Sequence, residues 1–145
     1  QLGLPLHVWG YREDGAYAEA VDASVPEGTL IWRGFVPTDQ LQAELGLCLA
    51  LLNTPKWNEA FGNVVVEAMA CGVPVAAYAR GGPGELVQEG LNGALARPDD
   101  RSDLAAALQR AMAVPRTRCR QWVEQHCSQD AFAGRIEAWL QGVAR

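Results

Sequence analysis

The stretch that decides the fold reads Glu59-Ala60-Phe61-Gly62-Asn63-Val64-Val65-Val66-Glu67, and Ala68-Met69-Ala70-Cys71-Gly72-Val73-Pro74 follows it. Three consecutive valines suit a strand, but Glu-Ala-Met-Ala favours a helix, and a glycine closely followed by a proline is typical of a helix end. Small or apolar residues also recur at the i, i+3, i+4 and i+7 spacing of one helix stripe; they are Val65, Ala68, Met69 and Gly72. These features predict a helix over residues 62–71 that packs on a sheet.

The start of this helix suits an anionic or hydroxylated ligand. Its first turn leaves backbone N–H groups near Phe61 to Val64 without intrahelical partners, and the helix dipole adds partial positive charge there. Glu67 shares a helix face with Asn63, and Glu59 lies in the loop just before the helix. Two carboxylates set around a helix start indicate a site that grips a polyhydroxylated ligand carrying phosphate.

Two apolar runs flank the helix and predict buried strands. The run from Leu45 to Leu52 has no charged or amide side chain, is too short to span a bilayer, and suits a strand buried on both faces that ends at Asn53. The run from Val73 to Tyr78 has the same character. Strand, loop, helix and strand make a βαβ unit, and ligands bind such sheets at the carboxyl ends of the strands, where Glu59 lies.

The whole chain alternates between strand and helix patterns. The predicted strands are Leu4–Trp9, Thr29–Val36, Leu45–Asn53, Val73–Tyr78 and Gly93–Ala96. The predicted helices are Glu13–Ala23, Thr38–Glu44, Gly62–Cys71, Gly84–Glu89, Ser102–Ala113, Pro115–His126 and Gln129–Gly142. This alternation predicts an α/β fold with a doubly wound parallel sheet, and we expect residues 1–145 to form a single domain.

The order and spacing of these motifs resemble the family 4 retaining glycosyltransferases of GT-B fold, in the Rossmann-like C-terminal domain that binds the nucleotide sugar. The resemblance extends over nearly the whole chain. It is carried by Gly10, the Gly34-Phe35-Val36 strand end, Pro55, Glu59, Phe61-Gly62, Glu67-Ala68-Met69-Ala70, Gly72-Val73-Pro74-Val75, Gly81-Gly82, Glu85, Gly93 and Pro98-Asp99.

The resemblance implies a role for each candidate residue. Glu59 is expected to contact the hydroxyls of the donor sugar, and Glu67 the ribose of the nucleotide. The backbone from Phe61 to Val64, with Gly62 and Asn63 inside it, is expected to bind the diphosphate. Gly81 and Gly82 are candidates for a close approach to phosphate, although turn geometry alone explains them as well. The ligand is then a nucleoside-diphosphate sugar, with neither a metal ion nor a cofactor.

Two elements typical of this family are missing from the chain as given. The donor domain normally opens with a strand and helix that supply an Arg and a Lys to the diphosphate, and an acceptor-binding domain lies upstream. We therefore expect a fragment of a longer protein, inactive by itself. Two alternatives stay open: a binding module of this fold without turnover, and a flavodoxin-like regulatory domain, which the motif from Glu59 to Glu67 disfavours.

Composition narrows the possible partners. Twelve basic and seventeen acidic residues give a net charge of −5 without a basic run, which argues against nucleic acid and against an anionic membrane surface. The four cysteines lack metal-ligand spacing and read as reduced thiols. No signal peptide is recognisable, so a cytoplasmic location is expected.

Overall fold

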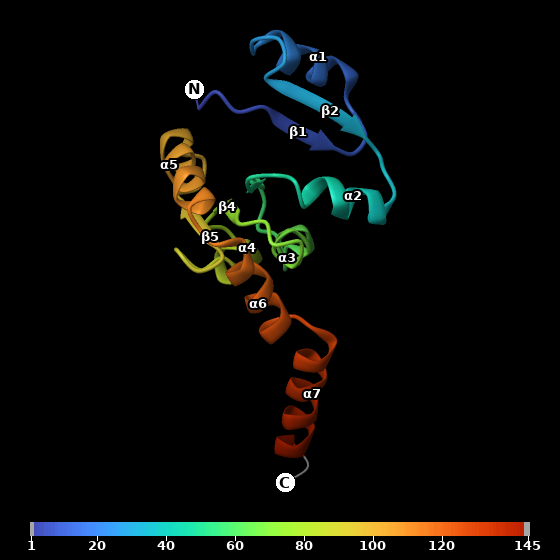
Figure 1. Ribbon diagram of the computed structural model, residues 1–145, viewed down its shortest axis with the longest axis vertical. Coiled ribbons are helices and arrows are strands. Elements are labelled where there is room, and N and C mark those ends of the chain that lie inside the picture. Colours follow the sequence, from blue (N-terminus) through green and yellow to red (C-terminus); the bar gives the residue numbers. More distant parts are fainter. Residues whose placement is uncertain (1, 144–145) are drawn as a thin grey trace. The chain divides into compact units, whose positions relative to one another are not determined.

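The computed structural model describes residues 2–143. Their contacts divide the chain into two compact units, residues 1–43 and residues 44–145. In the first unit, β1 (Leu6–Trp9) and β2 (Leu30–Gly34) lie side by side as a parallel two-stranded sheet (Figure 1). Helix α1 (Gly15–Ala23) connects them, and the Trp32 indole of β2 donates a 2.8 Å hydrogen bond to Asp22 of α1. Helix α2 (Thr38–Leu45) crosses the boundary between the units.

The second unit is built on a three-stranded parallel sheet in the order β3–β4–β5. The strands are β3 (Leu51–Asn53), β4 (Val75–Tyr78) and β5 (Gly93–Ala96). Its helices are α3 (Asn63–Ala70), α4 (Gly82–Leu86), α5 (Arg101–Met112), α6 (Arg116–His126) and α7 (Gln129–Val143). Every residue of the central strand β4 is buried, as its apolar sequence requires.

Helices cover both faces of this sheet. Alternate residues of β4 point to opposite faces, so that Val75 and Ala77 join one apolar cluster and Ala76 and Tyr78 join another. The first cluster contains side chains of α3 and α6, and the second contains side chains of α5, which packs on β4 and β5 (Figure 1). Parallel strands with helices on both faces confirm the predicted α/β fold class.

Helix α3 forms as its sequence pattern predicts. Val65, Ala68 and Met69 are fully buried in the first cluster. The helix ends in a left-handed turn, with Gly72 at φ 71°. The Gly72 N–H donates to the Met69 carbonyl and the Val73 N–H to the Ala68 carbonyl, both at 2.9 Å. These two bonds satisfy carbonyls that the helix end would otherwise leave without partners.

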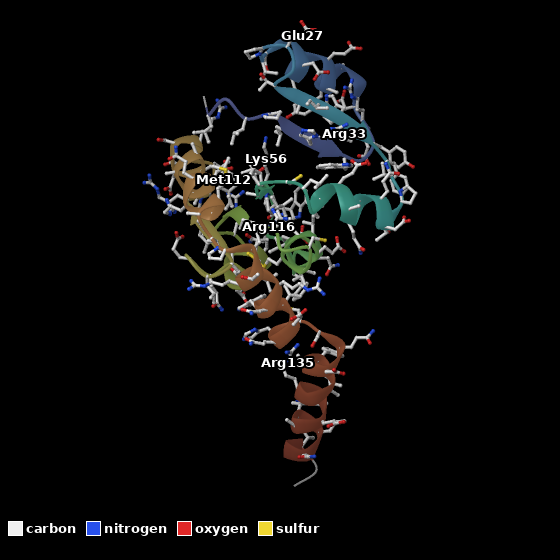
Figure 2. The ribbon with its side chains drawn as sticks, in the orientation of Figure 1. Glu27, Arg33, Lys56, Met112, Arg116 and Arg135 are labelled. Carbon is white, nitrogen blue, oxygen red and sulfur yellow. The ribbon has the colours of Figure 1, made fainter. Side chains whose placement is uncertain are left out.

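The strand predicted over residues 45–53 is wrong in its length and burial. Leu45 ends α2, β3 begins only at Leu51, and Leu47 is 86% exposed. The guanidinium of Arg116, at the start of α6 (Figure 2), donates to the carbonyls of Gly46 and Cys48. Those carbonyls therefore bind a side chain rather than a neighbouring strand.

The other predicted elements are present with ends displaced by a few residues. The largest displacement concerns α4, which begins at Gly82 rather than at Gly84 and ends at Leu86. The buried Asn92 side chain accepts the Gln88 N–H at 2.7 Å and donates to the Leu86 carbonyl at 3.0 Å, which fixes the turn after the helix. Contacts divide the chain into two units that are each compact by themselves. This division does not test whether residues 1–145 form a single domain, which stays a prediction.

Candidate functional site

The candidate site lies in the second unit, at the carboxyl ends of β3 and β4. The loop of residues 54–62 follows β3 and leads into α3, and Gly81 and Gly82 follow β4. Gly62 forms the N-cap of α3 with φ 92° and ψ 58°, and no side chain caps this helix start. The Val65 N–H bonds to the Gly62 carbonyl at 2.9 Å, so the amide groups before it, from Phe61 to Val64, remain the candidates for an outside acceptor.

Gly81 and Gly82 pack directly on the backbone of the Glu59 loop. The Gly82 N–H donates a 2.7 Å hydrogen bond to the Glu59 carbonyl. A Cβ atom on Gly81 would lie 2.8 Å from the Glu59 nitrogen, and one on Gly82 would lie 2.6 Å from the Phe61 Cα. Real Cβ atoms essentially never approach so closely. Turn geometry alone therefore does not explain these glycines, since their missing side chains let the two loops touch.

The Glu59 carboxylate is held by its own loop. Its Oε2 atom accepts a 3.1 Å hydrogen bond from the Trp57 indole Nε1, and the Glu59 residue is half-buried. The Trp57 ring itself is 65% exposed. A tryptophan in such a loop can stack on a sugar or pack locally. The structure shows a local hydrogen bond, with the ring still largely open to solvent.

The outer face of α3 extends the site along the helix. Asn63 and Glu67 lie on this face, as expected for residues one turn apart, and Asn63 is exposed. Phe61 and Val64 are 49% and 43% exposed, so apolar surface lies beside these polar groups. Single exposed apolar side chains are common on protein surfaces and do not by themselves indicate a ligand site. The ligand contacts of these residues stay predictions.

One charged residue of this region was not predicted from the sequence. Arg80 lies between β4 and Gly81; its guanidinium donates to the Pro55 carbonyl at 2.8 Å and pairs with Asp99 at 2.6 Å. The sequence signal that could have identified Arg80 is its place as a charged residue just after a buried parallel strand. Its two partners lie 25 and 19 residues away, and no local pattern reveals them.

No other feature of the described residues involves the predicted donor-binding residues. Residues 2–143 contain no group of three His, Cys, Asp or Glu side chains that could hold a metal ion. None of the described helices has the length and apolarity needed to cross a bilayer. An open depression of about 510 Å³ lies beside Trp32 in the first unit, and another of about 630 Å³ lies beside Trp122 in the second. Neither is lined by a predicted donor-binding residue.

Comparison with known proteins assigns the chain to a family. The family described as "Glycosyl transferases group 1" matches residues 5–129. The D-inositol 3-phosphate glycosyltransferase of Mycolicibacterium vanbaalenii is 39% identical over 92 residues, which are 63% of this chain and 20% of that protein. The 2-deoxystreptamine glucosyltransferase of Streptomyces kanamyceticus is 34% identical over 106 residues, 70% of this chain and 27% of that protein.

Solved structures agree in fold. The Anabaena protein HepE in complex with UDP has a TM-score of 0.79 and 25% identity, over 96% of this chain and 41% of HepE. Sucrose-phosphate synthase from Thermosynechococcus elongatus has a TM-score of 0.75 and 26% identity, over 97% of this chain and 38% of that enzyme. This chain thus spans well under half the length of each of these proteins. On the match over residues 5–129, it belongs to the group 1 glycosyl transferases.

Proposed function

We propose that this chain is the nucleotide-sugar-binding part of a retaining glycosyltransferase. The observation that carries the proposal is the contact of Gly81 and Gly82 with the Glu59 loop. This contact fixes the Glu59 loop beside the uncapped start of α3, at the carboxyl ends of two parallel strands. The family membership and the UDP bound to HepE support a nucleoside diphosphate as the common part of the ligand.

Each part of the site would bind one part of the donor. The amide groups around Phe61 to Val64 would donate hydrogen bonds to the diphosphate, and the dipole of α3 would stabilise its charge. Glu59 would hold the hydroxyls of the sugar, and Glu67 the hydroxyls of the ribose. Carboxylates suit these positions because each oxygen accepts hydrogen bonds from neutral hydroxyl groups.

The two carboxylates would orient the donor and would not act as the acid and nucleophile of a glycoside hydrolase. Glu59 lies in a loop, whereas Glu67 is on the second turn of α3, an arrangement unlike a carboxylate pair that flanks one glycosidic bond. In the proposed reaction the bond between the anomeric carbon and the diphosphate oxygen breaks, and the acceptor hydroxyl oxygen bonds to that carbon with retention. The hydroxyl proton passes to the departing diphosphate, whose charge the amides of α3 stabilise. No metal ion or cofactor takes part in this scheme.

The rest of the protein would complete the enzyme. The relatives are much longer than this chain, which supports an acceptor-binding domain elsewhere in the protein. We also propose that basic side chains outside residues 1–145 contact the diphosphate. The protein would be cytoplasmic, and this segment would contact neither nucleic acid nor a membrane.

Calorimetric titration of the full-length protein with UDP tests the proposal. We expect binding that Glu67→Ala weakens by about ten- to a hundredfold, because a charged hydrogen bond is worth about 1.5–3 kcal/mol. Glu124→Ala is the matched control, since Glu124 is an exposed helical carboxylate on α6 that pairs with Arg120 of the same helix. The melting temperature of both variants should stay at the wild-type value.

Three outcomes, one of them from a sugar-transfer assay, would count against the proposal or a part of it. Wild-type protein that binds neither UDP nor the diphosphates of the other bases would overturn the donor-binding role. Binding of the donor without any sugar transfer would instead favour the alternative of an inactive module of the same fold. Equal affinities of wild type and Glu67→Ala would remove the ribose role of Glu67 alone.

A further inference from the structure

Arg80 joins the three loops that follow the strands of the second unit. It lies in the loop after β4, its acceptor Pro55 in the loop after β3, and its ion-pair partner Asp99 in the loop after β5. The Arg80 side chain is 17% exposed, whereas Asp99 is 64% exposed. Arg80 is therefore largely buried among the loops at the end of the sheet, with its charge compensated from the solvent side.

The Glu59 loop is attached to the sheet at two points. Arg80 holds its first part through the Pro55 carbonyl at 2.8 Å, and the Gly82 N–H holds the Glu59 carbonyl at 2.7 Å. The side chains between these points, at Lys56, Trp57 and Asn58, are exposed and contribute little packing. Without the Arg80–Pro55 bond, this segment would be held only by the Gly82–Glu59 bond. It would then open more often, because exposed loop residues have few contacts of their own.

Arg80 differs in this respect from an ordinary surface ion pair. Exposed pairs usually contribute little, because solvent screens them and both side chains lose freedom. Here the pair with Asp99 orients a planar guanidinium whose other nitrogen binds a backbone carbonyl of a different loop. A planar guanidinium that binds the Pro55 carbonyl and the Asp99 carboxylate at once fixes the position of one relative to the other. A flexible lysine ammonium would not do so.

We propose that Arg80 is a positioning residue that fixes the Glu59 loop, and with it the Glu59 carboxylate and the Trp57 ring, in the geometry that the donor sugar requires. The loop-fixing part stands on the contacts of Arg80 alone. The part that concerns the sugar rests on the proposed function.

The sequence provides a direct probe of the loop. Lys56, labelled in Figure 2, is the one lysine of the chain, and it lies between the two attachment points. A lysine-specific endopeptidase therefore has one cleavage site in residues 1–145, after Lys56. Cleavage of a folded protein follows the population of locally opened states when opening is fast. The rate of cleavage at Lys56, followed by mass spectrometry of the full-length protein, thus measures how often the loop opens.

We expect Arg80→Met to raise this cleavage rate about tenfold or more, since it removes a charged hydrogen bond that closes the loop. Arg118→Met, a substitution of an exposed arginine on α6, is the control and should be cut at the wild-type rate. If Arg80→Met unfolds as judged by circular dichroism, Asp99→Asn carries the test, with an expected rise of about two- to fivefold. A folded Arg80→Met variant, or failing that a folded Asp99→Asn variant, that is cut at the wild-type rate would overturn the proposal.

Steady-state assays test the part that concerns the sugar. With UDP-glucose as the donor probe, Arg80→Met should lower kcat about tenfold while the inhibition constant of UDP changes less than about threefold. Equal losses in both would overturn the positioning role, because they indicate general damage. Wild-type protein that neither uses UDP-glucose nor binds UDP would count against the proposed function, and the cleavage rates would still decide the role of Arg80 in the loop.

Discussion

The substitution Gly81→Ala tests the contact between the glycine turn and the Glu59 loop. Gly81 has φ 59° and ψ −149°, a backbone conformation that residues with a side chain rarely adopt. Its new methyl group would lie 2.8 Å from the Glu59 nitrogen and 3.2 Å from the Asn58 carbonyl carbon, and would also meet the Glu59 carbonyl oxygen. All of these are backbone atoms, so no side-chain rotation relieves the clash.

The expected cost has two parts. Backbone strain at such an angle costs about 1–3 kcal/mol. Separation of the loops also breaks the hydrogen bond from Gly82 to Glu59, a further loss of about 1 kcal/mol. Gly90→Ala is a control for the strain contribution alone. Gly90 lies in the same unit with φ 72°, and a methyl group added there would meet no atom within 4 Å. That variant should lose only about 1–2 kcal/mol from strain.

Urea denaturation followed by circular dichroism measures both losses as free energies of unfolding. We expect Gly81→Ala to be less stable than Gly90→Ala by about 1 kcal/mol or more. Affinity for UDP-glucose should also fall in Gly81→Ala and not in Gly90→Ala. If both variants have equal stability and equal affinity, the close approach of Gly81 to Glu59 does not exist in solution.

Two other predictions concern the frame around the site. Gly72→Val should cost about 1–2 kcal/mol or more, because Gly72 has φ 71° at the end of α3, and thermal unfolding at wild-type stability would contradict that helix end. Burial raises the pKa of Glu89, but hydrogen bonds from Arg110 and the Leu95 N–H outweigh it and lower the pKa below 4.5. Arg110→Met should therefore be slightly less stable than wild type at pH 7, and denaturation curves should show that difference shrinking as the pH falls below the usual pKa of a Glu carboxyl.

Features that depend on neighbours in the sequence could be predicted. The buried stripe of Val65, Ala68 and Met69 follows from helical periodicity, and the end of α3 follows from Gly72 and Pro74. The place of Glu59 at the carboxyl end of a strand follows from the order of elements in a βαβ unit.

Features that depend on distant contacts could not be predicted. An apolar run such as residues 45–52 does not reveal whether its carbonyls face a strand or the guanidinium of Arg116, 68 residues away from Cys48. The packing of Gly81 on Glu59 and the bond from Arg80 to Pro55 likewise join segments that only the fold brings together. Candidate binding residues such as Glu59 and Glu67 can be predicted from the sequence, whereas contacts such as that of Arg80 with Pro55 are found only in the structure.

The substitution Glu59→Gln in the full-length protein tests the central claim most directly. If Glu59 holds the donor sugar, turnover of the intact donor should fall about tenfold or more, because a charged hydrogen bond worth about 1.5–3 kcal/mol is lost in the transition state. Affinity for UDP, which has no donor sugar, should stay within about twofold of wild type. Losses of equal size for donor turnover and UDP affinity would contradict the account, since Glu59 would then act at the diphosphate or in the fold.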